Sequence, residues 1–391
     1  MSKILFDLTK IQPVNGSKFH GGGKYGSIVF KKLAELAPDE IAGYYDDTRY
    51  IDQSIITICQ EKNIPLSKKS ECDVLTVAKR YDNILYSPLM DPAYLKDPSV
   101  NIIVTIHGLR VLEMPDDKYE FSYKKTSPLR RLLQKSILFE IFARKKRKND
   151  FKKNLAQKRA LLTNKQLKFI TVSNHSKYSL LSFIPSFKEN DITVFYSPST
   201  INDEISTEHY QNPYGKYYMI VSGDRWLKNG LRSIRALDEL FTERPEIKGN
   251  VVVTGLDKLS KLALSIKNPN RFVCLGYVDE PKLKALYQHA YLLLYPSLNE
   301  GFGYPPLEAM HEGTPVITSA FASIQEVCGD AVLYVNPYSV PEIKTRILQM
   351  ENNDMRVEYI KKGRERQRAV QQKQESDLQA LSNYIISFIK E

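Results

Sequence analysis

Short apolar runs alternate with longer amphipathic stretches along most of the chain. Each run is rich in β-branched residues and almost continuously apolar, which is typical of parallel strands covered on both faces. Twelve such runs begin, in chain order, at Ile4, Ile41, Ile84, Asn101, Lys168, Ile192, Tyr217, Asn250, Arg271, Ala290, Thr314 and Ala331. The amphipathic stretches between them predict helices. We therefore expect an α/β protein with parallel sheets, in which each half of the chain supplies half of the strands.

A polar stretch rich in Pro, Ser, Asn and Gly separates the two groups of strands at residues 197–216. Such a composition is typical of a linker between domains. We predict two doubly wound, Rossmann-like domains over residues 1–205 and 206–370, and a C-terminal helix over residues 371–391 that returns to the N-terminal domain. Open parallel sheets bind ligands beyond the carboxyl ends of their strands, so two sheets facing each other would enclose a deep cleft.

The composition is that of a soluble, globular chain, because 42% of its 391 residues are hydrophobic and 26% are charged. No apolar run approaches the roughly 20 residues that are needed to cross a bilayer. The chain opens directly on a strand-like run and not on a signal peptide. Its four cysteines form no Cys-x-x-Cys pair. These features favour a reducing cytoplasm.

The sharpest motif follows the strand-like run that begins at Ala290. The loop after this run contains Gly301-Phe302-Gly303, and Tyr304 and two prolines then open a helix. Proline fits the first helical turn, where an amide hydrogen would have no intrahelical partner. Small residues let the backbone approach a ligand closely, and the start of a helix carries a partial positive charge. We expect this loop to bind a diphosphate.

Two glutamates flank this loop, with Glu300 on the loop itself and Glu308 in the helix that follows. A carboxylate in a phosphate site is electrostatically unfavourable unless it has another partner. Ionised carboxylates only accept hydrogen bonds, so the hydroxyls of a ribose and of a transferred sugar are suitable partners. Helix capping by an acidic residue explains one glutamate but not the pair. The glutamates therefore favour a nucleotide sugar as the ligand.

This segment, with RFVCLGYVDEPKLKALYQHA before it and SIQEVCGDAVLYVNP after it, resembles the retaining family 4 glycosyltransferases of the GT-B fold, or glycosyl transferases group 1. The resemblance covers most of residues 217–345 and is looser in the N-terminal half. It implies that Glu300 contacts the donor sugar and that Glu308 holds the ribose of the nucleotide. It also implies that Val278 and Lys282 contact the base and the ribose.

Two basic residues, Arg225 and Lys228, follow the strand-like run that begins at Tyr217. Cations just beyond the carboxyl end of a strand can neutralise a diphosphate as its bond to the sugar breaks. The alternative is a solvated turn with ordinary basic residues. Members of the resembling family carry an Arg and a Lys-Asn pair in this place and role, and Lys228-Asn229 matches that pattern.

A glycine-rich stretch near the N-terminus raises a different hypothesis. It satisfies G-x-G-x-x-G and is followed by two acidic residues, the pattern of a dinucleotide-binding fingerprint; the residues are Gly21, Gly23, Gly26, Asp46 and Asp47. That fingerprint needs its first glycine directly after the first strand. Here a polar insertion, TKIQPVNGSKFH, separates the strand from the glycines. The insertion weakens the hypothesis of a dinucleotide-dependent oxidoreductase.

We expect these glycines to form a flexible loop over the cleft, with the helix continuing from Ser27. The resemblance implies that Gly22 and Gly23 approach the phosphates or sugar of the donor, while Lys24 either adds positive charge or lies at the surface. His107 ends the strand-like run at Asn101 and so lies at the cleft. A lone histidine is as often structural as catalytic, but the resemblance implies that His107 contacts the donor sugar near the reacting carbon.

Residues 124–168 carry sixteen basic residues against two acidic ones, a larger positive excess than the net charge of +11 of the whole chain. Leu129, Leu132, Leu133, Ile137 and Ile141 add an apolar stripe. A basic amphipathic helix suits an anionic membrane surface, and its apolar residues favour lipid over nucleic acid, the rival partner. A core-packed helix with a solvated basic face is the third interpretation.

We expect no metal and no cofactor, because no Asp-x-Asp motif occurs and the six histidines show no ligand-like spacing. With the resemblance, the sequence predicts a cytoplasmic, peripherally membrane-associated, retaining hexosyltransferase that is independent of metal. It would move a sugar from GDP-mannose or a UDP-sugar to a hydroxyl of a saccharide acceptor, lipid-linked, in surface polysaccharide or glycolipid synthesis. The alternatives are a non-catalytic nucleotide-sugar or nucleic-acid binding protein and a dinucleotide-dependent oxidoreductase.

Overall fold

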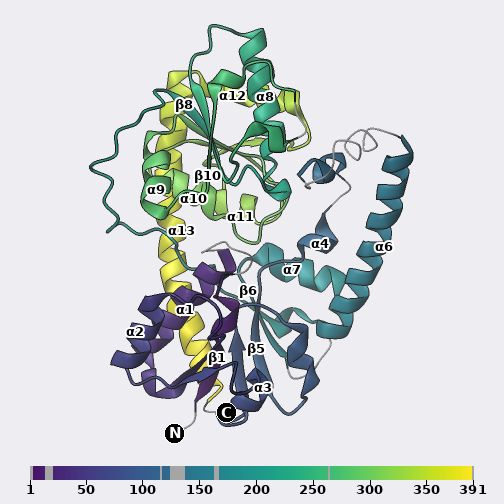
Figure 1. Ribbon diagram of the computed structural model, residues 1–391, viewed down its shortest axis with the longest axis vertical. Helices are drawn as coiled ribbons and strands as arrows, with labels where there is room; N and C mark the ends of the chain where they lie inside the picture. Colours follow the sequence, from purple (N-terminus) through teal and green to yellow (C-terminus); the bar gives the residue numbers. More distant parts are fainter. Residues whose placement is uncertain are drawn as a thin grey trace. The chain divides into compact units, whose positions relative to one another are not determined.

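The computed structural model describes residues 3–13, 21–114, 117–123, 137–162, 167–262 and 265–389 (Figure 1). The chain forms two compact units. The first unit consists of Met1–Leu112, Asn154–Thr200 and Gln371–Glu391, and the second consists of Glu113–Lys153 and Ile201–Val370. This division differs from the predicted domain limits, because Glu113–Lys153 belongs to the second unit and not to the N-terminal domain. Contacts made by Asp117 and Tyr123, described below, account for the difference.

A seven-stranded sheet forms the centre of the first unit, and its strands pair in parallel in the order β3-β2-β1-β4-β5-β6-β7. The strands are β1 (Ile4–Asp7), β2 (Ile41–Tyr45), β3 (Leu66–Lys68), β4 (Ile84–Ser87), β5 (Asn101–Ile106), β6 (Leu167–Thr171) and β7 (Ile192–Val194). The apolar runs predict all of them except β3. That strand escapes prediction because it is a three-residue edge strand with the sequence Leu-Ser-Lys.

The helices of the first unit are α1 (Gly21–Leu36), α2 (Gln53–Glu61), α3 (Val74–Ala78), α4 (Arg110–Glu113, whose last residue belongs to the second unit) and α7 (Asn174–Phe183). Helix α1 begins at Gly21, so the prediction of a flexible glycine loop is wrong for Gly22 and Gly23, which lie in its first turn. Gly26 allows close packing of the helix instead. A Cβ atom on Gly26 would lie 2.9 Å from the Cβ of Pro88, closer than carbon atoms approach in practice.

A six-stranded parallel sheet forms the centre of the second unit, in the order β10-β9-β8-β11-β12-β13. The strands are β8 (Tyr217–Ile220), β9 (Asn250–Thr254), β10 (Phe272–Gly276), β11 (Leu292–Tyr295), β12 (Val316–Ser319) and β13 (Leu333–Val335). The helices are α8 (Gly230–Glu243), α9 (Glu280–His289), α10 (Tyr304–His311), α11 (Ile324–Cys328) and α12 (Val340–Met350). The apolar runs predict all six strands.

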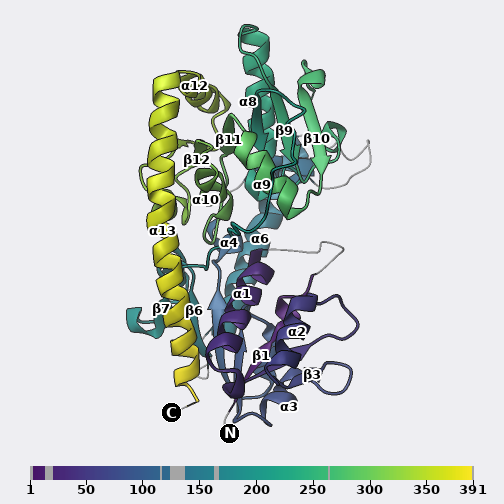
Figure 2. The same cartoon turned by 90° about the vertical axis from the view of Figure 1, so that its left-hand side faces the viewer.

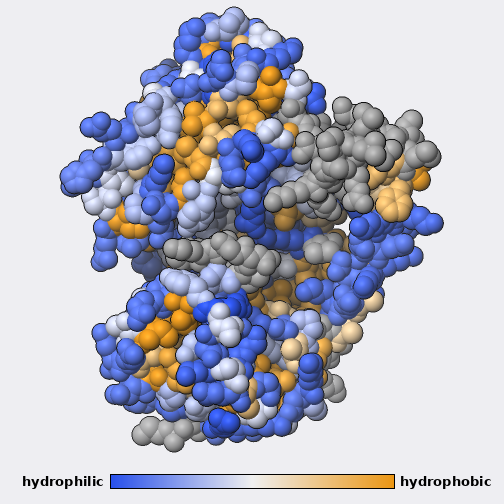
Figure 3. All heavy atoms as spheres, in the orientation of Figure 1, coloured by the Kyte–Doolittle hydropathy of each residue, from blue (hydrophilic) through white to orange (hydrophobic). Residues whose placement is uncertain are grey.

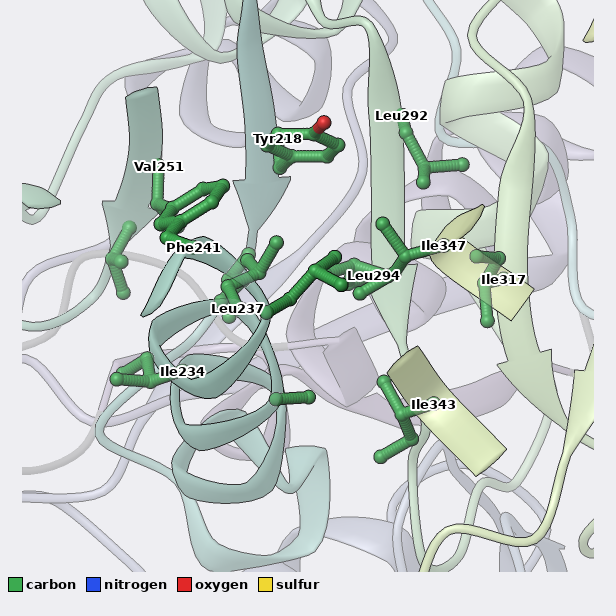
Figure 4. Packing of buried hydrophobic residues seen from close by; sticks show 14 of the residues in the cluster. Tyr218, Ile234, Leu237, Phe241, Val251, Leu292, Leu294, Ile317, Ile343 and Ile347 are labelled. Carbon is green, nitrogen blue, oxygen red and sulfur yellow. The ribbon is translucent and has the colours of Figure 1, made fainter. Parts of the chain in front are cut away.

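The hydrophobic core of the second unit lies between this sheet and helices α8 and α12, which contact each other. Figure 4 shows its labelled members packed together: Tyr218, Ile234, Leu237, Phe241, Val251, Leu292, Leu294, Ile317, Ile343 and Ile347. Leu237 is fully buried, and truncating such a side chain to alanine costs about 2 to 5 kcal/mol. The core fixes the carboxyl ends of β8 and β11, from which the candidate site is built.

Helix α13 (Asn353–Ser387) is one continuous helix, which begins well before the predicted helix at residue 371 (Figure 2). Its residues from Gln371 onward belong to the first unit. There the Asp377 carboxylate accepts a hydrogen bond from the backbone nitrogen of Tyr196 at 2.7 Å, and the Gln374 amide donates to the carbonyl of Ser197 at 2.6 Å. The end of the helix therefore completes the first unit.

Candidate active site

Strands β8 and β11 mark the point at which the strand order of the second unit reverses. From β8 the chain continues to β9 and β10 on one side, and from β11 to β12 and β13 on the other. Ligands of open α/β sheets bind beyond the carboxyl ends of the strands at such a point. Arg225 and Lys228 follow β8, and Glu300 follows β11. The topology thus brings together residues that lie far apart in the sequence.

Lys228 and Glu300 form a buried ion pair at this position. The lysine Nζ lies 2.6 Å from the carboxylate Oε1 of Glu300, and the two residues are 9% and 5% exposed. Both hydroxyls at the end of β11 also contact this carboxylate, with Tyr295 donating at 2.6 Å and the Oγ of Ser297 lying 2.5 Å away. The Lys228 ammonium also donates to the Tyr295 hydroxyl. Sequence reasoning singled out the ion-paired residues but missed the two hydroxyls.

The loops that carry the ion pair are tied together by backbone contacts. The backbone nitrogen of Leu298 donates to the carbonyl of Leu227 at 2.7 Å. Asn229 follows the 3₁₀ turn Trp226–Lys228 in the left-handed conformation, with a φ of 58°. Its side-chain amide donates to the carbonyls of Pro296 at 2.9 Å and Pro337 at 2.7 Å. Asparagine tolerates this conformation better than most residues, so Asn229 both ends the turn and links it to the β11 loop.

Helix α10 begins directly after this loop, at Tyr304, as the two prolines predict. Gly303 precedes it with a φ of 112°, and a Cβ atom there would lie 2.7 Å from the Cδ1 of Ile324. The Ser323 hydroxyl lies 3.0 Å from the carbonyl of Glu300 and 2.9 Å from that of Phe302. The loop backbone is therefore fixed, and it places the positive end of the α10 dipole beyond the carboxyl end of β11.

Glu308 lies half-buried in α10, where its Oε2 accepts a hydrogen bond from the Tyr287 hydroxyl at 3.1 Å. Burial and the charge of Glu308 raise the pKa of Tyr287 well above its usual value. Tyr287 therefore stays protonated and donates to the carboxylate. The contact orients Glu308, to which the resemblance assigned the ribose.

The remaining predicted residues of the second unit lie at the same edge of the sheet. Arg225 is exposed and directly precedes the turn Trp226–Lys228. Val278 lies in the loop between β10 and α9, and Lys282 lies in the first turn of α9. Strand β10 is the edge strand two places from β8. The Asp279 carboxylate caps α9 by accepting from the backbone nitrogen of Lys282 at 3.0 Å. The Lys282 side chain is exposed.

The predicted residues of the first unit gather at the carboxyl end of its own sheet. His107 follows β5, and its Nε2 lies 2.9 Å from the carbonyl of Pro88. Its ring meets that of Tyr25, in α1, edge to face at a centroid distance of 4.7 Å. A Cβ atom on Gly22 would lie 3.0 Å from the Cδ2 of Leu89. The start of α1 and the loops after β4 and β5 therefore form one cluster.

Two searches of the described residues bear on other kinds of site. No group of three or more His, Cys, Asp or Glu side chains is arranged to hold a metal ion in the described ranges. Among the helices that the structure describes, none is both long and apolar enough to cross a membrane. Independence of metal stays a prediction.

Residues 203–366 match the family model of glycosyl transferases group 1. The match covers less than half of the chain. The match contains Arg225, Lys228, Glu300 and Glu308, so the candidate site lies inside the matched residues. The structure is a GT-B glycosyltransferase fold, built from two Rossmann-like domains, as the sequence predicted.

Two curated relatives are similar to parts of the chain. The O-antigen chain mannosyltransferase RfbU of Salmonella typhimurium is 31% identical over 150 residues, which is 37% of this chain and 40% of the relative. O-antigen chain mannosyltransferase B of Escherichia coli is 48% identical over 80 residues, which is 20% of this chain and 21% of the relative. The chain thus matches less than half the length of these curated relatives.

A solved structure extends the comparison to almost the whole chain. A glycosyltransferase from Rickettsia africae matches with a TM-score of 0.63 and 14% identity, and the match covers 98% of each chain. At this identity the match shows the fold alone. The match includes both sheets, and not only the residues that the family model matches.

Proposed function

We propose that the protein is a retaining hexosyltransferase that transfers mannose from GDP-mannose to a hydroxyl of a saccharide acceptor in surface polysaccharide or glycolipid synthesis. The observation that carries this proposal is the buried Lys228–Glu300 pair at the reversal point of the sheet, within the residues that the family model matches. The mannosyltransferase names of the relatives favour mannose, and a UDP-sugar is the other donor consistent with the site.

The donor diphosphate would lie between the start of α10 and the two cations that follow β8. The positive end of a helix dipole favours an anion. Arg225, which is exposed, adds positive charge, and so does Lys228, whose charge is shared with Glu300. Glu308 would accept hydrogen bonds from the ribose hydroxyls, since the Tyr287 contact holds its carboxylate in one orientation. Val278 and Lys282 would contact the base and the ribose.

In the proposed reaction, the bond between the sugar carbon and the diphosphate oxygen breaks and the electron pair leaves with the diphosphate. Arg225 and Lys228 stabilise the negative charge that develops on this leaving group. The acceptor hydroxyl attacks the same face of the oxocarbenium-like sugar, and its proton passes to the departing phosphate oxygen. Glu300 stabilises and orients the sugar without forming a covalent bond.

The acceptor is proposed to be lipid-linked, with the protein bound to an anionic membrane surface through helix α6 (Ile137–Leu162). Most of the surface over α6 is hydrophilic (Figure 3), and Lys145, Lys146, Lys148, Lys152 and Lys153 are exposed. Ile141 and Phe142 are 59% and 64% exposed on the same helix. Basic residues beside exposed apolar side chains are typical of helices that lie on anionic lipid. The rest of the basic segment, residues 124–136 and 163–166, including Leu129, Leu132 and Leu133, lies outside the described residues.

Donor-dependent release of a nucleoside diphosphate tests the proposed activity. The purified protein is incubated with GDP-mannose, UDP-sugars and lipid extracts, with and without EDTA, and the product linkage is determined by NMR. We expect GDP release that EDTA does not reduce and an axial linkage at the transferred mannose. Donor binding without release would indicate a binding protein. Release that requires added metal would contradict the proposed site.

Sedimentation with vesicles tests the membrane proposal separately. We expect recovery with anionic vesicles to exceed recovery with neutral ones, and to fall with added salt because the lysines are screened. Replacing Ile141 and Phe142 by serine should reduce binding. Equal recovery with both kinds of vesicle would contradict membrane association and would leave the transferase proposal intact.

A further inference from the structure

The turn that carries Lys228 is held by a residue from a distant part of the sequence. Asp117 lies 109 positions before Trp226 and is 2% exposed. Its Oδ1 accepts a hydrogen bond from the Nη2 of Arg232 at 2.5 Å, and its Oδ2 accepts from the Nη1 of Arg232 at 3.1 Å. The same Oδ2 accepts from the indole Nε1 of Trp226 at 2.6 Å. One buried carboxylate therefore joins a guanidinium and the first residue of the turn.

These contacts hold the turn Trp226–Lys228 at both of its ends. Trp226 begins the turn, and Asn229 follows it in the left-handed conformation. Arg232 donates from its Nη1 to the side-chain oxygen of Asn229 at 2.9 Å. A bidentate arginine–carboxylate contact fixes distance and plane together, so the position of the backbone at Lys228 depends on Asp117.

Two further contacts from the same segment reach the loops of the candidate site. The Tyr123 hydroxyl accepts a hydrogen bond from the backbone nitrogen of Leu231 at 2.7 Å, in the first turn of α8. The Glu113 carboxylate accepts from the side-chain amide of Asn299 at 2.6 Å, next to Glu300. Asp117 and Tyr123 therefore contact the segment that carries the lysine, and Glu113 contacts the loop that carries the glutamate.

We propose that Asp117 is a positioning residue, which fixes the turn Trp226–Lys228 through Arg232 and Trp226 and so sets where Lys228 meets Glu300. The inference rests on the proposed function, in which Lys228 faces the leaving diphosphate. Displacing a reacting group by about 1 Å can cost about 100-fold in rate. Asp117 thus controls turnover without touching the donor.

Asp117→Asn removes the charge and keeps the shape of the side chain. We expect kcat to fall about 10- to 100-fold while the donor KM changes less than about 3-fold. Asp238→Asn is the matched control, because Asp238 is also a buried carboxylate but lies within α8 and accepts from the backbone nitrogens of Lys267 and Asn268. The control should keep the kcat of the wild type. A control that loses as much would overturn the inference.

A double variant separates positioning from a general structural effect. If Asp117 acts through Lys228, then Asp117→Asn combined with Lys228→Met is no slower than Lys228→Met alone. If the kcat of the double variant falls by the product of the losses in the two single variants, the inference is overturned. If Asp117→Asn fails to fold, Asp117→Glu takes its place, because it keeps the charge but displaces the contact by one methylene. We expect a reduced kcat from that variant as well.

Trp226 supplies a readout that does not need activity, since the chain contains one tryptophan. We expect the emission of Asp117→Asn to shift to longer wavelength and its quenching by acrylamide to increase, while Asp238→Asn matches the wild type. Unchanged emission and quenching in Asp117→Asn would overturn the inference. If the wild type transfers sugar from no donor, the proposed function fails, and the fluorescence result alone decides the role of Asp117.

Discussion

The Lys228–Glu300 pair makes a quantitative prediction about the substitution Lys228→Met. Methionine replaces the aliphatic stem of the lysine but leaves a carboxylate that is 5% exposed without its cation. Losing one partner of a buried ion pair costs about 3 to 5 kcal/mol. Tyr295 and Ser297 still contact the carboxylate, so we expect the lower end of that range, about 3 kcal/mol of unfolding free energy.

Replacing both partners should recover most of this loss. In Lys228→Met combined with Glu300→Gln, no buried charge remains, and the Tyr295 hydroxyl can still donate to the glutamine oxygen. We expect a coupling energy of about 2 to 3 kcal/mol between the two substitutions. The double variant should nevertheless transfer sugar much more slowly than the wild type, because the stabilising cation has been removed from the proposed leaving-group site. The double variant would thus recover stability without recovering activity.

Urea unfolding followed by Trp226 fluorescence measures the effect, because Trp226 lies in the second unit. Lys261→Met is the control in the same unit. Lys261 pairs with Asp257 at the surface, where both side chains are largely exposed, and such pairs contribute about 0 to 1 kcal/mol. If Lys228→Met costs no more than this control, the ion pair is not buried as described and the reasoning is refuted.

Three other predictions follow from the site and its surroundings. Gly303→Ala should destabilise the second unit by about 1 to 3 kcal/mol and raise the donor KM, because it strains a φ of 112°. Thermal unfolding measures the loss of stability, and an unchanged melting temperature would contradict it. Glu308→Gln should raise the donor KM about 10-fold with little change in kcat, whereas Arg225→Ala should mainly reduce kcat. Steady-state kinetics distinguish these two effects. If each variant changed kcat and the donor KM equally, the assignment would be refuted. Hydrogen bonds from Lys69 and Thr48 lower the pKa of Asp46 to about 2, so its stabilising contribution is present above about pH 4 and is lost as the pH falls through about 2. Asp46→Asn should therefore have a lower free energy of unfolding than the wild type at neutral pH. In urea titrations this difference should disappear towards pH 2. A difference in unfolding free energy that does not depend on pH would contradict the linkage.

The sequence predicts the strands well because continuous apolar runs are a local property of buried parallel sheets. The order of the strands then places Lys228 and Glu300 together, although 72 positions separate them. The prediction of a flexible loop at the glycine stretch was wrong, because glycines are compatible both with a flexible loop and with a helix that packs closely on Pro88. The sequence shows where the small residues are, but it does not show which side chains pack against them.

Other parts of the site could not be predicted from local patterns. Asp117 lies in an unremarkable polar stretch, and its partner Arg232 is 115 positions away. A buried polar network of this kind depends on which loops meet in space, which only the tertiary structure supplies. The hydroxyls of Tyr295 and Ser297, in contrast, stand at the end of an apolar run, and their place beyond a strand could have identified them as polar neighbours of Glu300.

The discontinuous make-up of the two units has a consequence for biosynthesis. The ribosome makes the chain from its N-terminus, yet the first unit includes residues from Gln371 onward, among them the fully buried Leu381 and Ile385. Its packing can be finished only after the entire second unit has been translated. Nascent chains shorter than this would expose the apolar surface that these side chains cover, and exposed surface of this kind favours aggregation. We therefore expect the second unit to complete its folding first. The sheet of the first unit can be fully covered only after the end of α13 has been synthesised.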